Sequence, residues 1–336
     1  MMLRKLACSA FLGAIALSLP SSGRTAQAAG GTTIKMATLV PRGSGTERDF
    51  QKINKLVRNA TGGKWKIKLF PSGVAGDEKD VIRKMRVGQL DASIVTTTGL
   101  SQIVREVAVL DAPGVINSYK ELDRVKTGLR QEWQQTFRKQ GMELLGWGEA
   151  GQYRYFSKRP IQRISDLKKM RPWLWPSSQV LKEIFRAVGA TGVPLGVPEV
   201  YGALQTGMVD AAINTSVGAS GLQWWSKAKH VTAQTAGVML MGVVITDKRW
   251  KGIPPDVQEI LRKEVHRATE KNIAPTRKDD LLTYKRLVKL GLKPTKWDAA
   301  AVKEYETMAA TVRGRLTGRI YPKELLDRVV ATARGQ

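Results

Sequence analysis

The sequence contains very few of the residues that build metal and thiol sites. Its 336 residues include one cysteine, Cys8, and two histidines, His230 and His266. A metal site made of cysteine and histidine needs about four such ligands, so we expect no metal site of that kind. The sequence also has no G-x-S-x-G segment, the turn that presents a nucleophilic serine in many hydrolases. We therefore expect no metal, no cofactor and no enzymatic activity.

Long apolar runs are also scarce. The run Leu6–Leu19 follows two basic residues and is too short to cross a bilayer comfortably. Ala26-Gln27-Ala28 then supplies the small-x-small pattern of a signal peptidase site. These features predict a signal peptide over residues 1–28, a mature chain that starts near Ala29, and a periplasmic protein that does not itself span a membrane. Cys8 would leave with the signal peptide.

Acidic residues are few: 29 against 55 lysines and arginines, for a formal net charge of +26. Loss of the predicted signal peptide leaves 52 basic residues and a net charge of +23. The basic residues are scattered along the chain without a run of five or more, which indicates a solvated basic surface. Because export removes the usual nucleic-acid targets, we expect no nucleic-acid partner. An adhesive basic surface protein, with salt-sensitive binding to polyanions, is one alternative.

The first part of the mature chain alternates strand and helix patterns. Ile34–Val40 is apolar, Thr46 with Asp49 resembles a capping box for a helix that ends near Ala60, and Lys64–Phe70 alternates with period two. A helix over Asp77–Val87 leads into a third apolar run. This order predicts a mainly parallel sheet.

Two stretches of the sequence nearly repeat each other. Val87–Thr97 reads VGQLDASIVTT, and Thr206–Ser216 reads TGMVDAAINTS. In each, a glycine can end a helix in the left-handed conformation, and an apolar run then predicts a buried strand. Both runs finish in small polar residues, Thr96–Thr98 and Asn214–Ser216. Because ligands bind at the carboxyl ends of strands in α/β sheets, the repeat predicts two similar lobes with a ligand cleft between them.

The remaining patterns distribute the chain between these lobes. We expect helices at 119–140, Ser178–Val188 and Asp298–Ala333, a long helix from Pro255 to Leu290 interrupted at Pro275, and strands at Met142–Trp147, Gln152–Ser157 and Val238–Thr246. The long helix is expected to join the lobes. We assign 29–150 with 239–280 to lobe I, and 151–238 with 281–336 to lobe II.

Gly146–Gly151 matches G-x-G-x-x-G, but a strand pattern follows it where a dinucleotide site needs a helix. We interpret these glycines as allowing close approach of the backbone where the chain passes between lobes.

Nine tryptophans are more than a core of this size requires. Several fall where the cleft is expected, and a tryptophan ring offers a broad apolar face to an organic ligand: Trp147, Trp173, Trp175, Trp224 and Trp225.

Taken together, these segments resemble a known family. The stretches are IKMATLVPRGS, TGGKWKIKLFPSGVAGDEKDVIRKMRVGQLDA, FSKRPIQRISDLKKM and GVPEVYGALQTGMVDAAIN. They are similar to the DctP-type solute receptors of tripartite ATP-independent periplasmic (TRAP) transporters, and Glu199–Asp210 is the most specific of the matches. The resemblance implies an α/β, two-lobed periplasmic-binding-protein fold, type II-like, with the ligand cleft between lobes and a long connecting helix. It also implies a receptor that captures a small organic ligand, closes on it, and delivers it to TRAP membrane permease subunits driven by a sodium or proton gradient.

Most members of that family bind organic acids through an arginine late in a D-L-K-G-x-K-x-R segment. Here the segment reads DLKKMRPWLW, so Trp173 occupies the arginine position and Arg171 precedes it by two residues. A second family arginine, in G-x-R-x-x-x-S, is replaced by Tyr153, with Arg154 next to it. Asn214 matches the polar residue that the family presents from its second lobe. Two aromatic residues in place of two guanidinium groups favour a more apolar or aromatic ligand.

We therefore predict a ligand site lined by seven residues: Thr97, Glu149, Tyr153, Trp173, Trp175, Asn214 and Trp224. Arg154 and Arg171 are second choices, needed if the ligand is anionic. The alternatives are the binding protein of an ATP-driven (ABC) importer, which shares the two-lobed plan, and an exported hydrolase, which the scarcity of histidine disfavours.

Overall fold

The structure, a computed structural model, describes residues 32–271 and 273–336. The predicted signal peptide, residues 1–28, lies outside the described residues. The described chain contains two main β-sheets with helices packed on them, which confirms the α/β class and the two-lobed plan.

The first sheet has the strand order β2-β1-β3-β10-β4. Its strands are β1 (Thr33–Thr38), β2 (Lys66–Phe70), β3 (Ala92–Thr96), β4 (Met142–Gln152) and β10 (Val238–Thr246). β1 pairs in parallel with β2 and β3, whereas β10 is antiparallel to both β3 and β4. The sheet is therefore mainly parallel, as predicted, with β10 running against its neighbours.

The second sheet has the order β11-β9-β5-β8. Its strands are β5 (Arg154–Ser157), β8 (Ala211–Asn214), β9 (His230–Thr232) and β11 (Lys293–Thr295). A short parallel pair, β6 (Trp173–Leu174) with β7 (Val193–Pro194), lies beside it through a bridge between Pro172 and Ala211. The predicted strand Gln152–Ser157 is divided, because Gln152 still pairs in the first sheet and Tyr153 separates it from β5.

The repeated segments adopt the same local structure in both lobes. Gly88 and Gly207 have φ angles of +75° and +80°, the left-handed conformation that glycine adopts without strain. In lobe I, Asp91 N donates to Lys35 O at 2.9 Å, and Lys35 N donates back to Asp91 Oδ2 at 2.7 Å. In lobe II, Asp210 and Arg171 exchange the same two hydrogen bonds, at 3.1 and 2.7 Å. Each repeated aspartate thus fastens the start of its strand to the neighbouring chain segment.

The polar residues at the ends of β3 and β8 also act alike. Thr96 caps the short helix α3 (Thr97–Leu100), its hydroxyl accepting from Thr98 N at 3.2 Å. Thr215 caps α8 (Ser216–Gly221), its hydroxyl accepting from Gly218 N at 3.0 Å. The two strands therefore end in equivalent turns, one from each lobe.

Helix α1 (Gly45–Ala60) begins slightly earlier than predicted. Its N-cap is Ser44, whose hydroxyl accepts from Glu47 N at 3.2 Å, while Glu47 accepts from Gly43 N. Ser44 is therefore the N-cap, Glu47 bonds to the N–H of the residue before it, and the predicted pairing of Thr46 with Asp49 is wrong. Both candidates had the spacing of the motif, so only the backbone path distinguishes them.

The remaining helices follow the predicted order with two differences. They are α2 (Glu78–Arg86), α4 (Tyr119–Gly128), α5 (Arg130–Lys139), α6 (Gln179–Val188), α7 (Val200–Thr206), α9 (Asp247–Lys251), α12 (Ala299–Leu316) and α13 (Lys323–Arg334). Residues 119–140 form two helices, and so does the C-terminal segment, where Gly318 has a φ of +76° and Pro322 is the N-cap of α13. Helix α12 packs on α6, and α13 packs on α4.

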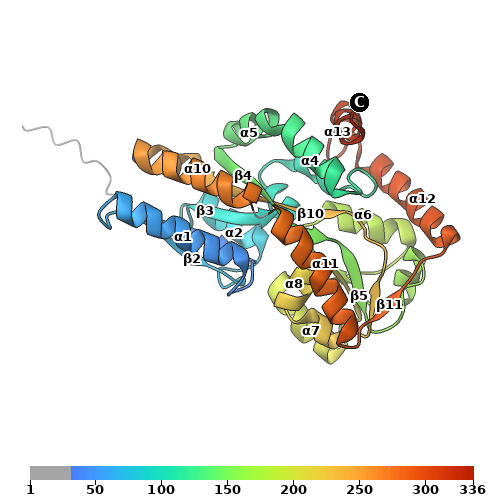
Figure 1. The fold of residues 1–336 in the computed structure, drawn as a ribbon. Coiled ribbons are helices and arrows are strands. Elements are labelled where there is room, and N and C mark those ends of the chain that lie inside the picture. The colour runs from blue at the N-terminus through green and yellow to red at the C-terminus, as the bar shows by residue number, and fades with distance from the viewer. Residues whose placement is uncertain (1–31, 272) are drawn as a thin grey trace, which may run out of the picture. The chain divides into compact units, whose positions relative to one another are not determined.

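The predicted connecting element is formed by α10 (Pro255–Lys271) and α11 (Ile273–Lys289). Helix α10 packs along α1 and β4 over the first sheet, and α11 packs on α8 of the second lobe (Figure 1). Pro275 lies in the first turn of α11, where a missing N–H breaks no helical hydrogen bond. The pair therefore runs from one lobe to the other, as expected of a long connecting helix.

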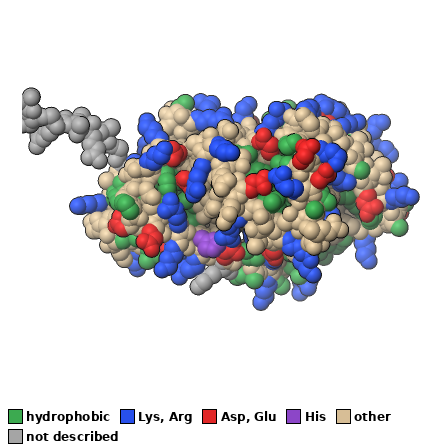
Figure 2. Space-filling view, turned by 90° about the horizontal axis from the view of Figure 1, so that it is seen from above, with side chains coloured by type: hydrophobic (Ala, Val, Ile, Leu, Met, Phe, Trp, Pro, Cys, Tyr) green, Lys and Arg blue, Asp and Glu red, His purple; other side chains and the backbone are tan. Residues whose placement is uncertain are grey.

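The basic residues are spread over the surface. On the face seen in Figure 2, lysine and arginine side chains are interleaved with acidic and neutral ones and do not form one continuous patch. No helix within residues 32–336, residue 272 excepted, is both long and apolar enough to cross a bilayer.

Candidate functional site

A cavity of about 440 Å³ lies between the two sheets. This volume is within the range of small-molecule sites, about 300–1,000 Å³. Lobe I contributes the loop after β1, part of α1, and the end of β3. Lobe II contributes β5, β6, the end of β8 and α8. The cavity therefore lies where the repeated strands of the two lobes end, as the sequence predicted.

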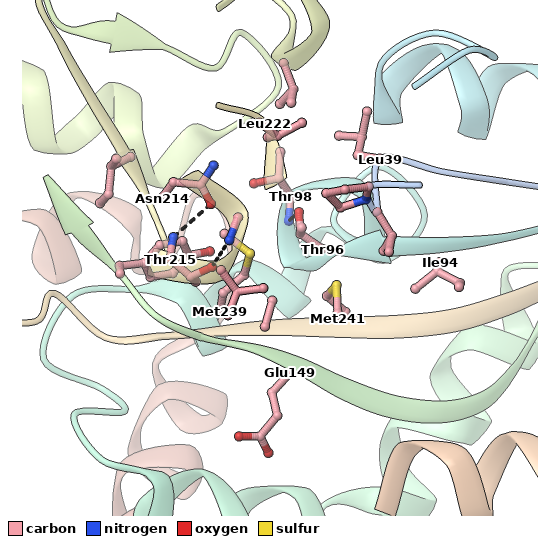
Figure 3. A pocket seen from close by; sticks show the side chains of 18 of the residues that line it. Leu39, Ile94, Thr96, Thr98, Glu149, Asn214, Thr215, Leu222, Met239 and Met241 are labelled. Atoms are coloured by element: carbon pink, nitrogen blue, oxygen red, sulfur yellow. Dashed lines mark hydrogen bonds between the residues drawn. The ribbon is translucent and has the colours of Figure 1, made fainter. Parts of the chain in front are cut away.

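Figure 3 shows how the walls of the cavity face each other. Asn214 and Thr215 lie on one side and Leu39, Thr96 and Thr98 on the other. Asn214 Oδ1 accepts from Thr215 N at 2.8 Å, which fixes the amide and leaves its NH₂ group as a donor. Gly218 makes room for this arrangement, because a Cβ there would lie 2.2 Å from Asn214 Oδ1. Met239 and Met241 of β10 add an apolar surface to the cavity.

Three of the five tryptophans that we placed near the cleft line the cavity. The Trp173 ring lies 5.7 Å from that of Trp175 and 5.2 Å, edge to face, from that of Trp224, measured between centroids. Trp147 instead packs edge to face on Phe137, beside a separate surface groove. Trp225 does not line the cavity; it packs, partly buried, against the core. Trp147 and Trp225 therefore do not line the cavity, since a ring count cannot tell which face of an element is directed into a cavity.

The indole nitrogens of two lining tryptophans are already bonded within the protein. Trp173 Nε1 donates to Leu195 O at 2.8 Å, and Trp175 Nε1 donates to Asp77 Oδ2 at 2.7 Å. The second of these hydrogen bonds crosses from lobe II to lobe I. Burial raises the pKa of Asp77, which the Trp175 hydrogen bond partly offsets. Both residues therefore offer ring surface to the cavity, and Trp175 also helps to hold the lobes together.

A second contact between the lobes involves an acid that the sequence reasoning missed. Tyr153 Oη donates to Asp111 Oδ1 at 3.2 Å, and both residues line the cavity. Burial raises the pKa of Asp111 to about 6, although the hydrogen bond from Tyr153 acts in the opposite direction. Thr97 itself is 1% exposed and is not part of the cavity wall, whereas Thr96 and Thr98 are. The Thr97 hydroxyl is buried without a hydrogen-bond partner behind this wall.

Glu78 is the other lining acid that the sequence reasoning missed. Its carboxylate accepts from Thr96 N at 2.7 Å and from Thr96 Oγ1 at 2.8 Å. Burial nevertheless raises the pKa of Glu78 to about 8. Its place in the first turn of a helix suggested only a favourable dipole interaction. One signal in the sequence could have placed Glu78 near the cavity: its helix directly precedes the first repeated strand, whose end lies in the cavity wall.

Glu149 borders the cavity, but its carboxylate points away from the other labelled side chains (Figure 3). Glu149 Oε1 accepts from Lys126 Nζ at 3.3 Å. Arg277 of α11 donates to the same carboxylate through Nε at 2.8 Å and Nη2 at 2.9 Å, and also bonds to Asp123. In this structure Glu149 therefore joins β4 to α4 and α11.

The two second-choice arginines lie outside the cavity wall. Arg154 Nη1 donates to the carbonyls of Thr232 and Ala233, and its guanidinium stacks 4.1 Å from the centre of the Tyr284 ring. The Arg171 side chain is 63% exposed and lies beside Asp210. Of the seven first-choice residues, Thr97 does not line the cavity and the Glu149 carboxylate points away from it; the other five line it: Tyr153, Trp173, Trp175, Asn214 and Trp224.

The chain crosses between lobes at Gly151, where the backbone does approach closely. Gly151 has a φ of +108°, and a Cβ there would lie 2.3 Å from Asp280 Cγ. Asp280 accepts from Gln152 N at 3.1 Å and from Ser216 N at 2.8 Å, so it joins β4, α8 and α11. This geometry supports the interpretation of the glycine-rich segment as a close crossing.

Comparisons with known proteins agree with this geometry. The C4-dicarboxylate-binding periplasmic protein DctP of Rhodobacter capsulatus is 25% identical over 275 residues, 80% of each chain. The protein of the same name from Vibrio cholerae is 22% identical over 240 residues, 71% of this chain and 72% of that one. A TRAP periplasmic solute-binding protein of Ralstonia eutropha with bound (S)-2-acetolactate has the same fold, with a TM-score of 0.83, 24% identity, and coverage of 91% of this chain and 99% of that one.

The family model for bacterial extracellular solute-binding protein family 7, DctP, matches residues 36–313. This range includes both sheets, except for the first residues of β1, and the five clustered side chains of the cavity. The chain belongs to the DctP family of bacterial extracellular solute-binding proteins.

Proposed function

We propose that this protein is the periplasmic solute receptor of a TRAP transporter. It binds a small organic molecule in the cavity between its lobes and delivers it to the membrane permease subunits. The observation that carries this proposal is the position of the cavity, at the ends of two equivalent strands from two lobes. Neither an ABC importer nor an exported hydrolase is favoured by the family match.

The contacts between lobes indicate how binding is coupled to closure. The hydrogen bonds Trp175–Asp77 and Tyr153–Asp111 both join lobe II to lobe I beside the cavity. A ligand that touches both walls adds to these contacts only when the lobes are together. It therefore shifts the population toward the closed state, which the permease can distinguish from the open one.

The residues that we propose to contact the ligand are the five clustered ones: Tyr153, Trp173, Trp175, Asn214 and Trp224. Thr97 and Glu149 are not assigned to the ligand, because Thr97 does not line the cavity and the Glu149 carboxylate bonds to Lys126 and Arg277. The relatives named above bind small organic acids by name, and a solved relative from Shewanella oneidensis carries succinate. A small organic molecule is accordingly the class of solute that we propose here.

The test is direct binding to the purified protein. We expect mass spectrometry of the denatured protein to identify a co-purified organic molecule, and calorimetry to show saturable one-to-one binding of it, with the molecule recovered unchanged. Trp173→Phe should weaken binding, since it removes ring surface from the cavity wall. Trp147→Phe is the matched control, because Trp147 is similarly buried but lies outside the cavity. Absence of saturable binding, or equal effects of the two substitutions, would contradict the proposal.

A further inference from the structure

The cavity walls carry few positive charges. Among the described lining residues, the lysines and arginines are Arg48 and Lys52, both exposed on α1. Arg48 Nη1 donates to Gly43 O, and Lys52 Nζ lies 3.3 Å from Asp49 Oδ1. These two cations therefore lie at the solvent-exposed edge of the cavity, and each already has a partner.

The cations near the inner end of the cavity are engaged elsewhere. Lys126 and Arg277 bond to the Glu149 carboxylate, and Arg277 also bonds to Asp123. Arg154 Nη1 donates to the carbonyls of Thr232 and Ala233, and although its buried Nε has no hydrogen-bond partner, Arg154 is not among the residues that line the cavity. A ligand carboxylate placed among the tryptophan rings would therefore have no cation beside it.

The inner wall carries acids instead. Glu78 and Asp111 both line the cavity from lobe I, and burial raises the pKa of both carboxyl groups. At neutral pH Glu78, with a pKa of about 8, keeps its proton, whereas Asp111, with a pKa of about 6, is mostly charged; a ligand anion near Asp111 would be repelled and would lose its own hydration. Burying an ionised carboxylate without a counter-charge is strongly unfavourable, so this wall selects against anionic ligands.

Two hydrogen-bond donors in the wall remain available. The Tyr155 hydroxyl is buried without a hydrogen-bond partner, although Tyr155 lines the cavity and is only 2% exposed. Burial raises its pKa well above the usual value, so the hydroxyl keeps its proton. The Asn214 NH₂ group is the second donor, because its carbonyl oxygen is held by Thr215 N. A buried donor without a partner is costly and commonly marks a site completed by a bound molecule.

We propose that the solute is an uncharged organic molecule with a large apolar surface, whose carbonyl or hydroxyl oxygen accepts hydrogen bonds from Tyr155 and Asn214. The rings of Trp173, Trp175 and Trp224 cover its apolar part. This inference rests on the proposed receptor function and specifies the chemistry of the same cavity.

The test uses three probes with one ring system and different charges: 2-naphthamide, 2-naphthoate and 2-naphthylmethylammonium. Each is titrated calorimetrically into the full mature protein at neutral pH. We expect one-to-one binding of the amide, at least tenfold tighter than that of either charged probe. Equal or tighter binding of the carboxylate would overturn the proposal, and so would a preference for the ammonium, which would indicate that the acids bind a cation.

Two substitutions test the proposed donors. Tyr155→Phe removes a hydroxyl that has no partner in the protein, so the fold should be retained while amide binding weakens about tenfold. Asn214→Asp keeps the oxygen that accepts from Thr215 N and replaces the donor, and should also weaken amide binding about tenfold. Arg48→Gln is the control at the cavity edge and should leave amide binding unchanged. Unchanged amide affinity in both donor variants would refute their assigned role.

The two proposals fail in different ways. If the molecule extracted from the protein is a carboxylate that binds one to one, the ligand class is wrong and the receptor function stands. If no probe binds and no molecule is extracted, the receptor function itself is wrong.

Discussion

Substitution of Glu149 by glutamine tests the buried charge cluster beneath the cavity. The Glu149 side chain is 1% exposed and that of Lys126 is 5% exposed, and Arg277 binds the same carboxylate through two nitrogens. The glutamine side chain is uncharged and leaves the Lys126 ammonium buried without a counter-charge. Removing one partner of a buried ion pair costs about 3–5 kcal/mol, and we expect Glu149→Gln to lower the free energy of unfolding by that amount.

The measurement is urea unfolding followed by circular dichroism. Glu132→Gln is the matched control, because Glu132 pairs with Arg328 at the surface, where the side chains are 43% and 52% exposed. An exposed pair of this kind contributes about 1 kcal/mol at most. The double variant Glu149→Gln with Lys126→Met should lose less stability than Glu149→Gln alone, since it leaves no unpaired ammonium. A loss for Glu149→Gln no larger than the control, or strictly additive losses in the double variant, would refute this reasoning.

Three further predictions concern single side chains elsewhere in the fold. Because the pKa of Glu78 is raised to about 8, the folded protein keeps a proton that the unfolded chain releases above its ordinary pKa of 4.5. The free energy of unfolding should therefore fall as the pH rises from 4.5 to about 8, and it should fall less steeply in Glu78→Gln. Unfolding midpoints measured at several pH values test this. Gly151→Ala should lower the free energy of unfolding in urea by at least about 2 kcal/mol, because it combines a positive φ with a Cβ against Asp280. Gly291→Ala is the control: its φ is +112° but no neighbour lies within 4 Å, so it should lose less stability. Asp210→Ala should cost about 1–3 kcal/mol in thermal unfolding, since the backbone N–H of Arg171 loses its acceptor. No loss would mean that water replaces the carboxylate.

The repeated segments were predictable because their signals are local. A glycine at a left-handed position and an aspartate three residues later are set by the chain within one turn, and Gly88 and Gly207 adopt the predicted conformation. The same reasoning gave the strands β3 and β8 and the small polar residues that end them. The two lobes and the position of the cavity follow directly from these two copies.

The details of the cavity were less predictable. Trp147 and Trp173 look alike in the sequence, but one packs on Phe137 outside the cavity and the other lies in its wall. Glu149 was assigned to the ligand because it lies in the glycine-rich crossing, and its actual partners, Lys126 and Arg277, come from two other elements. The burial of Glu78 was not predicted, because the helical pattern alone does not show that the end of β3 folds back over this carboxyl group.

From the sequence alone came the two-lobed α/β fold, the family and the place of the cavity, because each depends on patterns within some ten residues and on the order of the elements. The tertiary structure decided which side chains face the cavity and which charges are already paired. Those outcomes depend on contacts such as Trp175–Asp77 and Arg277–Glu149, between residues 98 and 128 positions apart. A short pattern cannot encode such contacts, since they form only when the lobes and the connecting helices pack together.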